Sequence, residues 1–234
     1  MEIFGPERLR DQGLLPEQEE SGNRAILALL SDPEVADQMD LVATYRRGES
    51  ESDGGEAGAY EVWAARGMVR FRRLCRDDGS LDYQVVEQVG ENPIGCQDPH
   101  ALRTVAEEKE AARLSGFDAD DPARRFIAPE QQSYPFAYER VAQLFDSPNA
   151  PDLVISPRDW CWGIQLGTHG GLQVRQARGP LWFSGPGVRP GRYELAARSI
   201  DIAPTCLAAL DFPLIDGADA TGRTSGERGV APDV

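Results

Sequence analysis

The sequence predicts an α/β domain, in which strands alternate with helices. Short runs rich in β-branched and aromatic residues alternate with segments whose apolar residues recur at helical spacing. Two runs, "PDLVISP" and "GPLWFSGPGV", are continuous and apolar, as is typical of strands buried in a parallel sheet. With 234 residues, 41% of them apolar, the chain is long enough to bury a sizeable core.

The first elements are a helix and a strand, followed by a loop. "GNRAILALLSD" predicts a short helix at about 22–31, with Ser21 as its N-cap. "DLVATYRRG" then predicts a strand. Residues 48–58 are acidic and glycine-rich, a composition that does not bury enough apolar surface to offset its own ordering, so we expect a long solvated loop there.

A β-hairpin insertion is expected next. In "YEVWAARGMVRFRRL" two β-rich runs flank Arg66-Gly67, and the glycine suits a position with positive φ. "LDYQVVEQ" predicts a further strand. Two amphipathic helices follow, in "HALRTVAEEKEAARLSG", which ends in a glycine suited to the C′ position, and in "YPFAYERVAQLFDS".

The last third of the chain predicts a strand, a histidine-containing loop, a second strand and a helix. We expect residues 152–156 and 180–184 to be neighbouring strands of one sheet, with the 201–210 helix packed on its face. Asp201 is placed to cap that helix, and Pro204 stands early enough in it to be tolerated. The domains expected are 1–148, a partial α/β segment with the hairpin insertion, 149–223, a C-terminal segment, and 224–234, a disordered tail.

Charge and cysteine spacing exclude several functional classes. The net charge of −15, from 39 acidic and 24 basic residues, would repel nucleic acid and anionic membrane surfaces. The four cysteines form no CxxC pair, which argues against a zinc ribbon or a thioredoxin-type motif and for ordinary reduced, partly buried thiols. No leader-like N-terminus and no apolar stretch of about 18 residues is present, so a cytoplasmic location is expected.

His169 is the candidate metal ligand. It stands in "GTHGG", just after a strand of buried type, where the small neighbours leave room for a metal to approach the imidazole. Because ligands come in clusters, a lone histidine among glycines is also compatible with a solvated loop residue. The local residues leave both interpretations open.

The ordered motifs of this region resemble the C-terminal segment of the alkaline phosphatase superfamily, most closely its type I phosphodiesterase/nucleotide pyrophosphatase branch and more distantly the sulfatases. "PDLVIS", "GTHGG", "GPLWFSGPGVRPG" and "RSIDIAPTCLAALDFPLIDGADATGR" follow one another over about residues 150–223. The resemblance implies an alkaline-phosphatase-like mixed sheet with flanking helices, here incomplete. It also implies hydrolysis of phosphodiesters by two-step phosphoryl transfer between two zinc ions, with His169 as a ligand of one of them.

Most of that catalytic apparatus is missing from the chain. The family has a Thr or Ser nucleophile, an Asp-x-x-x-His pair and an Asp-His pair upstream of the matched region. This chain has two histidines, with Gln165 four residues before His169 and Cys96 four residues before His100. Two zinc sites cannot be assembled from these residues, so we expect the chain to be inactive alone and to bind no zinc by itself.

Three functional hypotheses follow. The favoured one is the C-terminal part of a phosphodiesterase-like hydrolase, whose partner is a complementary N-terminal half or a second copy of the chain. The alternative is a non-catalytic domain that binds a protein partner or a ligand. The third, an enzyme with an unrelated site, ranks last because no nucleophile–base pair is visible.

The remaining polar and aromatic candidates carry less weight. His100 is expected at the surface, Asp98 and Asp152 in a loop or at a strand edge, and Thr205 at a helix start rather than as a nucleophile. Trp160 and Trp162 are compatible with stacking on a substrate, but closing the edge of a core is the commoner use of such pairs.

Overall fold

The computed structural model describes residues 14, 16–48, 58–77, 80–114, 131–147, 149–158, 171–192 and 197–212. The chain divides into two compact units, which are described separately. One unit contains Met1–Arg73 and Tyr83–Arg178, and the other contains Leu74–Asp82 and Gly179–Val234. The acidic segment at 49–57 and the tail at 224–234 lie outside the described residues.

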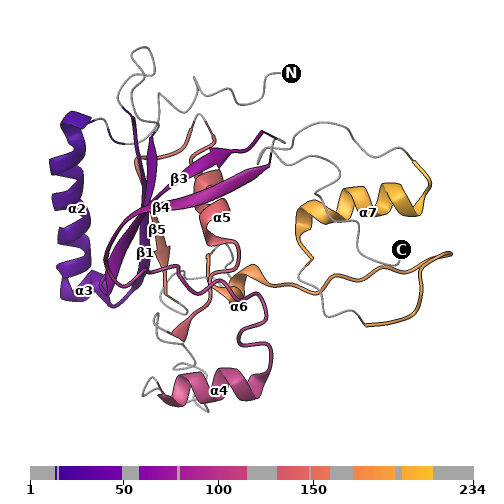
Figure 1. The fold of residues 1–234 in the computed structure, drawn as a ribbon. Coiled ribbons are helices and arrows are strands. Elements are labelled where there is room, and N and C mark those ends of the chain that lie inside the picture. The colour runs from indigo at the N-terminus through magenta and orange to yellow at the C-terminus, as the bar shows by residue number, and fades with distance from the viewer. Residues whose placement is uncertain are drawn as a thin grey trace. The chain divides into compact units, whose positions relative to one another are not determined.

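An antiparallel sheet forms the centre of the first unit (Figure 1). Its five strands have the order β4-β3-β2-β1-β5. The strands are β1 (Met39–Arg46), β2 (Ala59–Ala64), β3 (Gly67–Cys75), β4 (Leu81–Gly90) and β5 (Leu153–Pro157). The strand expected from "DLVATYRRG", the hairpin and the strand expected from "LDYQVVEQ" are therefore confirmed as β1, β2–β3 and β4.

The expectation of a mixed sheet with buried parallel strands was wrong. β5 pairs antiparallel with β1, and Ile155 in its middle is 46% exposed. The β2–β3 pair is joined by the two-residue turn Ala65–Arg66, a connection that only antiparallel strands allow. Gly67, which pairs with Ala64 after this turn, has φ +157°, so the predicted positive φ is confirmed.

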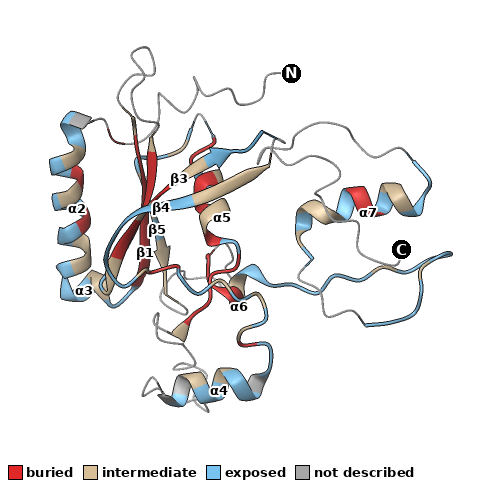
Figure 2. Cartoon of the chain, in the orientation of Figure 1, coloured by how far each residue is buried: buried red, intermediate tan, exposed pale blue. Residues whose placement is uncertain are grey.

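Helices lie on both faces of the sheet within this unit. One face is covered by α5 (Ala137–Leu144), which buries Ala137, Val141 and Ala142 in the main core. That core also contains Leu41, Ala43, Tyr45, Tyr60, Val62, Ala64, Val69, Phe71, Ile94, Tyr134, Phe145 and Leu172. The opposite face carries a smaller cluster of Ile26, Met39 and Val42, and Figure 2 shows buried residues concentrated on β1 and on α5.

The N-terminal helices differ slightly from the expectation. Helix α2 (Glu19–Ser31) follows a 3-10 turn, η1 (Pro16–Gln18), so it begins before Ser21. Ser21 is therefore not the N-cap, and its hydroxyl donates to the Gln18 carbonyl at 2.9 Å. The short helix α3 (Pro33–Ala36) is capped by Asp32, which accepts from the Glu34 amide.

Two further helices complete the first unit. Helix α4 (Val105–Leu114) and α5 are the two amphipathic helices that the sequence predicts. The glycine expected at the C′ position of the former lies outside the described residues. Helix α6 (Val174–Ala177) was not expected, and its Val174 is buried against Leu102 beside Ala111 of α4.

The second unit contains the C-terminal helix but lacks the expected strand. Residues 180–184 have no strand structure, and Trp182 is 85% exposed. Pro180 has no amide hydrogen, and the Gly-Pro-Gly turn limits the run to a few residues, so its apolar character alone does not create a strand. The expected pairing of 152–156 with 180–184 was therefore wrong.

The C-terminal helix itself is confirmed. A 3-10 turn, η5 (Ser199–Asp201), leads into α7 (Ile202–Ala209), with Pro204 in the first turn. Asp201 occupies the N-cap position, but its carboxylate accepts from the Arg198 amide at 2.7 Å instead of capping α7. Thr205 donates to the Asp201 carbonyl at 2.6 Å, which agrees with its interpretation as a helix-start residue.

Candidate functional site

A β-bulge in β1 creates the most unusual polar site of the first unit. Met39 pairs with Pro157 and Leu41 with Ser156, so Asp40 is an extra residue in the ladder. Met39 packs in the cluster beside α2, whereas Leu41 packs in the core beneath α5. Bulges re-aim side chains and are frequent beside active sites, and this one directs a carboxylate into the interior.

Asp40 is satisfied by hydrogen bonds although it is only 2% exposed. The Tyr134 hydroxyl donates to both carboxylate oxygens, at 2.8 and 3.0 Å, and the Gln173 amide nitrogen donates to Oδ2 at 2.9 Å. The Arg66 guanidinium lies 3.9 Å from Oδ1. A buried carboxylate without such partners would be strongly destabilising, so these residues form one interdependent group, which we call the Asp40 cluster.

Tyr134 remains a neutral donor in the Asp40 cluster. Burial, with the nearby charge of Asp40, raises its pKa well above the ordinary 10.0. Arg66 donates to the Tyr134 hydroxyl at 3.2 Å and to the Pro93 carbonyl at 2.6 Å. A tyrosine that holds its proton so firmly is suited to orienting a carboxylate and unsuited to acid–base exchange near neutral pH.

The Asp40 cluster lies where the chain leaves β5 and where it returns. Besides its bond to Asp40, the Gln173 amide nitrogen donates to the carbonyl of Pro157, the last residue of β5, at 2.8 Å. The Val174 amide donates to the Ser133 carbonyl at 2.7 Å. The two ends of the connection that carries His169 are thereby joined at a buried polar centre.

His169 itself lies outside the described residues, as do Trp160, Trp162 and Gln165.

The other candidates from the sequence do not come together in a site. His100 is exposed, and its backbone amide donates to the Asp98 carboxylate at 2.8 Å in a local turn. Asp152 is exposed just before β5, where its backbone carbonyl accepts from the Thr44 hydroxyl. The thiols of Cys75, Cys96 and Cys206 are free and exposed, so the expectation of partly buried cysteines was wrong for these three.

The described residues do not fit a zinc ion. Within those ranges, no group of three or more His, Cys, Asp or Glu side chains converges closely enough to hold a metal. The Asp40 carboxylate is already occupied by hydrogen-bond donors, which leaves it poorly placed as a ligand.

A second buried charge group stabilises the opposite face of the sheet. Glu61 is fully buried and accepts from Arg46 at 2.9 Å, from Arg70 at 2.7 Å and from the Trp63 indole at 2.9 Å. Arg46 also bonds Asn23 on α2. Arg46 lies on β1, Glu61 on β2 and Arg70 on β3, and Arg46 also reaches α2, so this group links three strands to one helix. It therefore has the character of a structural ion pair.

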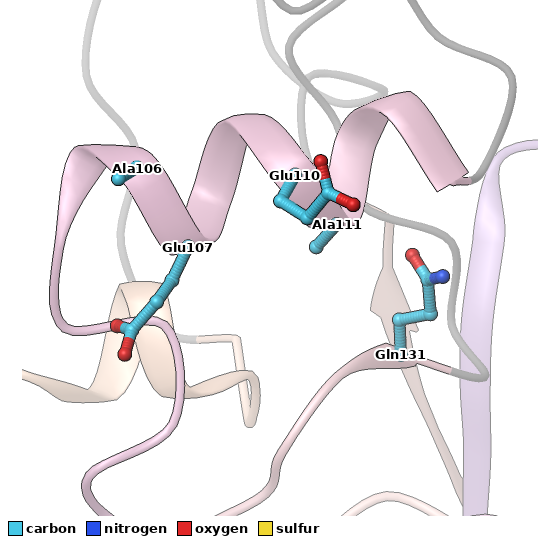
Figure 3. Close-up of a pocket in the computed structure, with 5 residues that line it drawn as sticks. All are labelled: Ala106, Glu107, Glu110, Ala111 and Gln131. Atoms are coloured by element: carbon cyan, nitrogen blue, oxygen red, sulfur yellow. The ribbon is translucent and has the colours of Figure 1, made fainter.

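An open hollow of about 550 Å³ lies beside α4 (Figure 3). Its lining consists of Ala106, Glu107, Glu110, Ala111 and Gln131. Both carboxylates are engaged locally: Glu107 accepts from the Thr104 amide and Glu110 from the Arg113 guanidinium. The hollow thus presents an acidic helix surface without a convergent set of free polar groups.

Sequence reasoning missed the residues that make up the Asp40 cluster. Asp40 looks like the polar residue at the start of a strand, and Tyr134 and Gln173 are separated from it by 94 and 133 positions. Met39-Asp40-Leu41 alternates apolar and polar residues as a regular strand does, so no local signal in the sequence marks the bulge or identifies the partners.

No helix within the described residues combines the length and apolar character needed to cross a membrane.

Comparisons with models of protein families, with curated proteins and with solved structures found no match.

Proposed function

We propose that the chain is the C-terminal part of a metal-dependent phosphodiesterase-like hydrolase of the alkaline phosphatase superfamily, with His169 as a zinc ligand. The observation that carries the proposal is the order of four motifs in the last third of the sequence, with "GTHGG" between "PDLVIS" and "GPLWFSGPGV". The joining of Pro157 to Gln173 supports it, since a ligand-bearing connection works best on a fixed base.

The sheet gives the proposal no support. Residues 180–184 are not a strand, and β5 pairs antiparallel with β1, so the neighbouring strands expected from the resemblance are absent from the described residues. The proposal therefore depends on the motifs and not on the observed topology.

In this proposal the nucleophile and the remaining ligands come from a separate N-terminal part. The zinc ion, when bound, would stabilise the leaving oxygen and supply a hydroxide for hydrolysis of the covalent intermediate. The contribution of this chain is to hold one ligand on a connection whose two ends are fixed by the Asp40 cluster.

Reconstitution tests the proposal. The chain is co-expressed with the product of the reading frame immediately upstream and assayed on bis(4-nitrophenyl) phosphate with added zinc. We expect a complex whose hydrolysis falls by about a hundredfold or more in His169→Ala, as is common for a lost catalytic group, and is retained in the matched variant His100→Ala. Without the upstream product, the wild-type chain should hydrolyse the substrate no faster than the His169→Ala chain does.

Two outcomes would contradict the proposal. One is an upstream frame without a Thr or Ser nucleophile and an Asp-x-x-x-His pair. The other is zinc-dependent hydrolysis by the complex that His169→Ala leaves unchanged.

A specific observation favours the alternative, a self-sufficient domain that binds a partner or ligand. The first unit has its own core on both faces of the sheet and a buried ion-pair group at Glu61. A monomer in light scattering with a cooperative melt above about 60 °C, together with no activity in the co-expression assay, would favour this binding domain over a fragment.

A further inference from the structure

Gln173 connects three parts of the first unit through one amide group. It is 1% exposed, and its Nε2 donates to Asp40 Oδ2 at 2.9 Å and to the Pro157 carbonyl at 2.8 Å. Both hydrogens of the amide nitrogen are thus used, which fixes the side chain in a single orientation. Gln173, the N-cap residue of α6, thereby links the start of that helix to the bulge of β1 and to the end of β5.

Arg140 of α5 donates hydrogen bonds to the two residues that precede Gln173. Its Nη1 donates to the Leu172 carbonyl at 2.8 Å and its Nη2 to the Gly171 carbonyl at 3.0 Å. Burial lowers the pKa of Arg140, so a charged group has been placed here at a cost in hydration. Residues Gly171–Gln173 are consequently held by hydrogen bonds to α5, through Arg140, and to β1 and β5, through Gln173.

The other end of the connection is fixed as well. The Arg158 amide donates to the Gln38 carbonyl at 2.9 Å, one residue beyond the last pairing of β5 with β1. Arg158, which precedes 159–170, is therefore held next to β1, and Gln173, shortly after 170, is bonded to Asp40 of β1 and directly to Pro157.

We propose that Gln173 is a positioning residue, which fixes the separation of Pro157 and Gly171 and so sets where the connection between them leaves the sheet. Its functional meaning rests on the proposed function, because that connection carries His169. A buried amide contributes little net stability compared with an apolar side chain of similar volume. Two hydrogen bonds to defined acceptors do, however, specify one geometry for the chain ends, which apolar packing would not.

Hydrogen exchange on the full chain tests the positioning role directly. Gln173→Met retains the length of the side chain but removes both bonds. We expect exchange at Arg158 and at Gly171–Val174 to rise about tenfold or more, while β2 and β3 keep their protection. The matched control Gln143→Met, which loses one 3.4 Å bond to Glu139 on α5, should leave these amides unchanged.

A second variant covers the case in which Gln173→Met does not fold. Arg140→Lys keeps the charge but loses the two-pronged donor, and we expect it to raise exchange at Gly171 and Leu172 by about the same factor. Unchanged exchange at these amides in both variants would overturn the proposal. A uniform rise across β1, β2 and β3 would also overturn it, because that pattern reports general destabilisation.

Hydrolysis by the reconstituted complex separates the two proposals. We expect Gln173→Met to lower kcat by about 10–100-fold with little change in KM, the effect of misplacing a metal ligand through its supporting residues. If His169→Ala abolishes hydrolysis while Gln173→Met retains it, the positioning role is wrong and the proposed function stands. If His169→Ala has no effect, the proposed function is wrong regardless of Gln173.

Discussion

Arg73 and Asp146 form a two-point ion pair that fastens β3 to the residue just beyond the end of α5. The two guanidinium nitrogens lie 2.9 and 2.7 Å from the carboxylate oxygens, and the side chains are only 17% and 9% exposed. Burial opposes the charged form of Arg73, but the hydrogen bonds to Asp146, together with electrostatic interactions with Asp146, Tyr60 and Tyr83, outweigh it and raise the pKa of the guanidinium. The guanidinium also lies over the Tyr60 ring at 5.8 Å.

Asp146→Ala should therefore destabilise the first unit markedly. We expect a loss of about 3 kcal/mol in the free energy of unfolding, because the variant leaves Arg73 buried without its carboxylate. The matched control is Asp82→Ala, which breaks the exposed pair of Asp82 with Arg76 and should cost less than about 1 kcal/mol. Urea denaturation measures both, and equal losses in the two variants would show that burial of the Arg73 pair is unimportant.

Stability should decline at alkaline pH because of buried tyrosines. Desolvation is the main cause that raises the pKa of Tyr60 and of Tyr134 above 10.0. A raised pKa in the folded state means that the associated stability is present below pH 10.0 and is lost as the pH rises, since only the unfolded chain releases these protons readily.

Unfolding free energies measured between about pH 8 and pH 11 check this expectation. The decline should be smaller in Tyr60→Phe than in the wild type. A tyrosinate absorbance titration in which all tyrosines ionise near pH 10.0 before unfolding would contradict it.

Helix α4 should lose its first turn in acid. Thr104 and Glu107 form a reciprocal cap, with Glu107 Oε2 accepting from the Thr104 amide at 2.9 Å and Thr104 Oγ1 from the Glu107 amide at 3.2 Å. The Thr104 amide bond is the main cause that lowers the pKa of Glu107 below 4.5. A lowered pKa gives stability that is present above pH 4.5 and is lost as the pH falls through the folded-state value.

Amide chemical shifts of Thr104 and Glu107 across an acid titration measure this effect. Thr104→Pro, which removes both the hydroxyl and the amide hydrogen, should abolish it and bring the pKa of Glu107 back toward 4.5. If the midpoint for Glu107 is the same with and without the Thr104 hydroxyl and amide bonds, the cap does not govern the helix start.

Gly67→Ala should disrupt the β2–β3 hairpin. A Cβ at this position would collide with the backbone oxygens of Val89 and Glu91, and neither can move away as a side chain can. We expect a loss of about 2 kcal/mol or more. Gly95→Ala is the matched control, because its Cβ would meet Asn92 at an ordinary 3.4 Å and should change stability by less than about 1 kcal/mol. Thermal melts compare the two, and a near-neutral Gly67→Ala would contradict the steric argument.

Ile155→Lys should reduce self-association of the chain. Among the described strands β5 ends the sheet order, and Ile155 is 46% exposed on it, so this edge of the described sheet offers backbone groups and apolar surface to another copy. Leu27→Lys makes the same change on α2, at a leucine that is 50% exposed, and should leave association unchanged. Sedimentation velocity measures this difference, and a monomeric wild type would remove the basis of the expectation.

Local patterns predicted most of the individual elements correctly. Helical periodicity identified α2, α4, α5 and α7, and the turn glycine identified the β2–β3 hairpin, because these features depend on neighbours within a few residues. The errors arose where structure depends on distant partners. β5 was assigned to a parallel sheet from its apolar run, although its direction is decided by pairing with β1 more than a hundred positions away.

The candidate site was less predictable than the fold. The partners of Asp40 are a tyrosine before α5 and a glutamine after the His169 connection, and neither residue type announces a buried network on its own. Buried polar groups are recognisable only once the fold has removed them from water. His169 was selected by its place among the motifs that resemble the alkaline phosphatase superfamily and by the glycines around it, and neither signal reports the presence of other ligands.

The bulge at Asp40 also affects how related sequences should be compared. Side chains in a strand alternate with a period of two, yet Met39 and Leu41 face different cores because one residue has been added between them. A relative that lacks this residue would have a regular strand. Its apolar residues before the bulge position would then be shifted by one position relative to those of this chain. Alignment of such a sequence by hydrophobicity alone would place a core residue opposite Asp40, so a single-residue gap at this point carries structural information and should be retained.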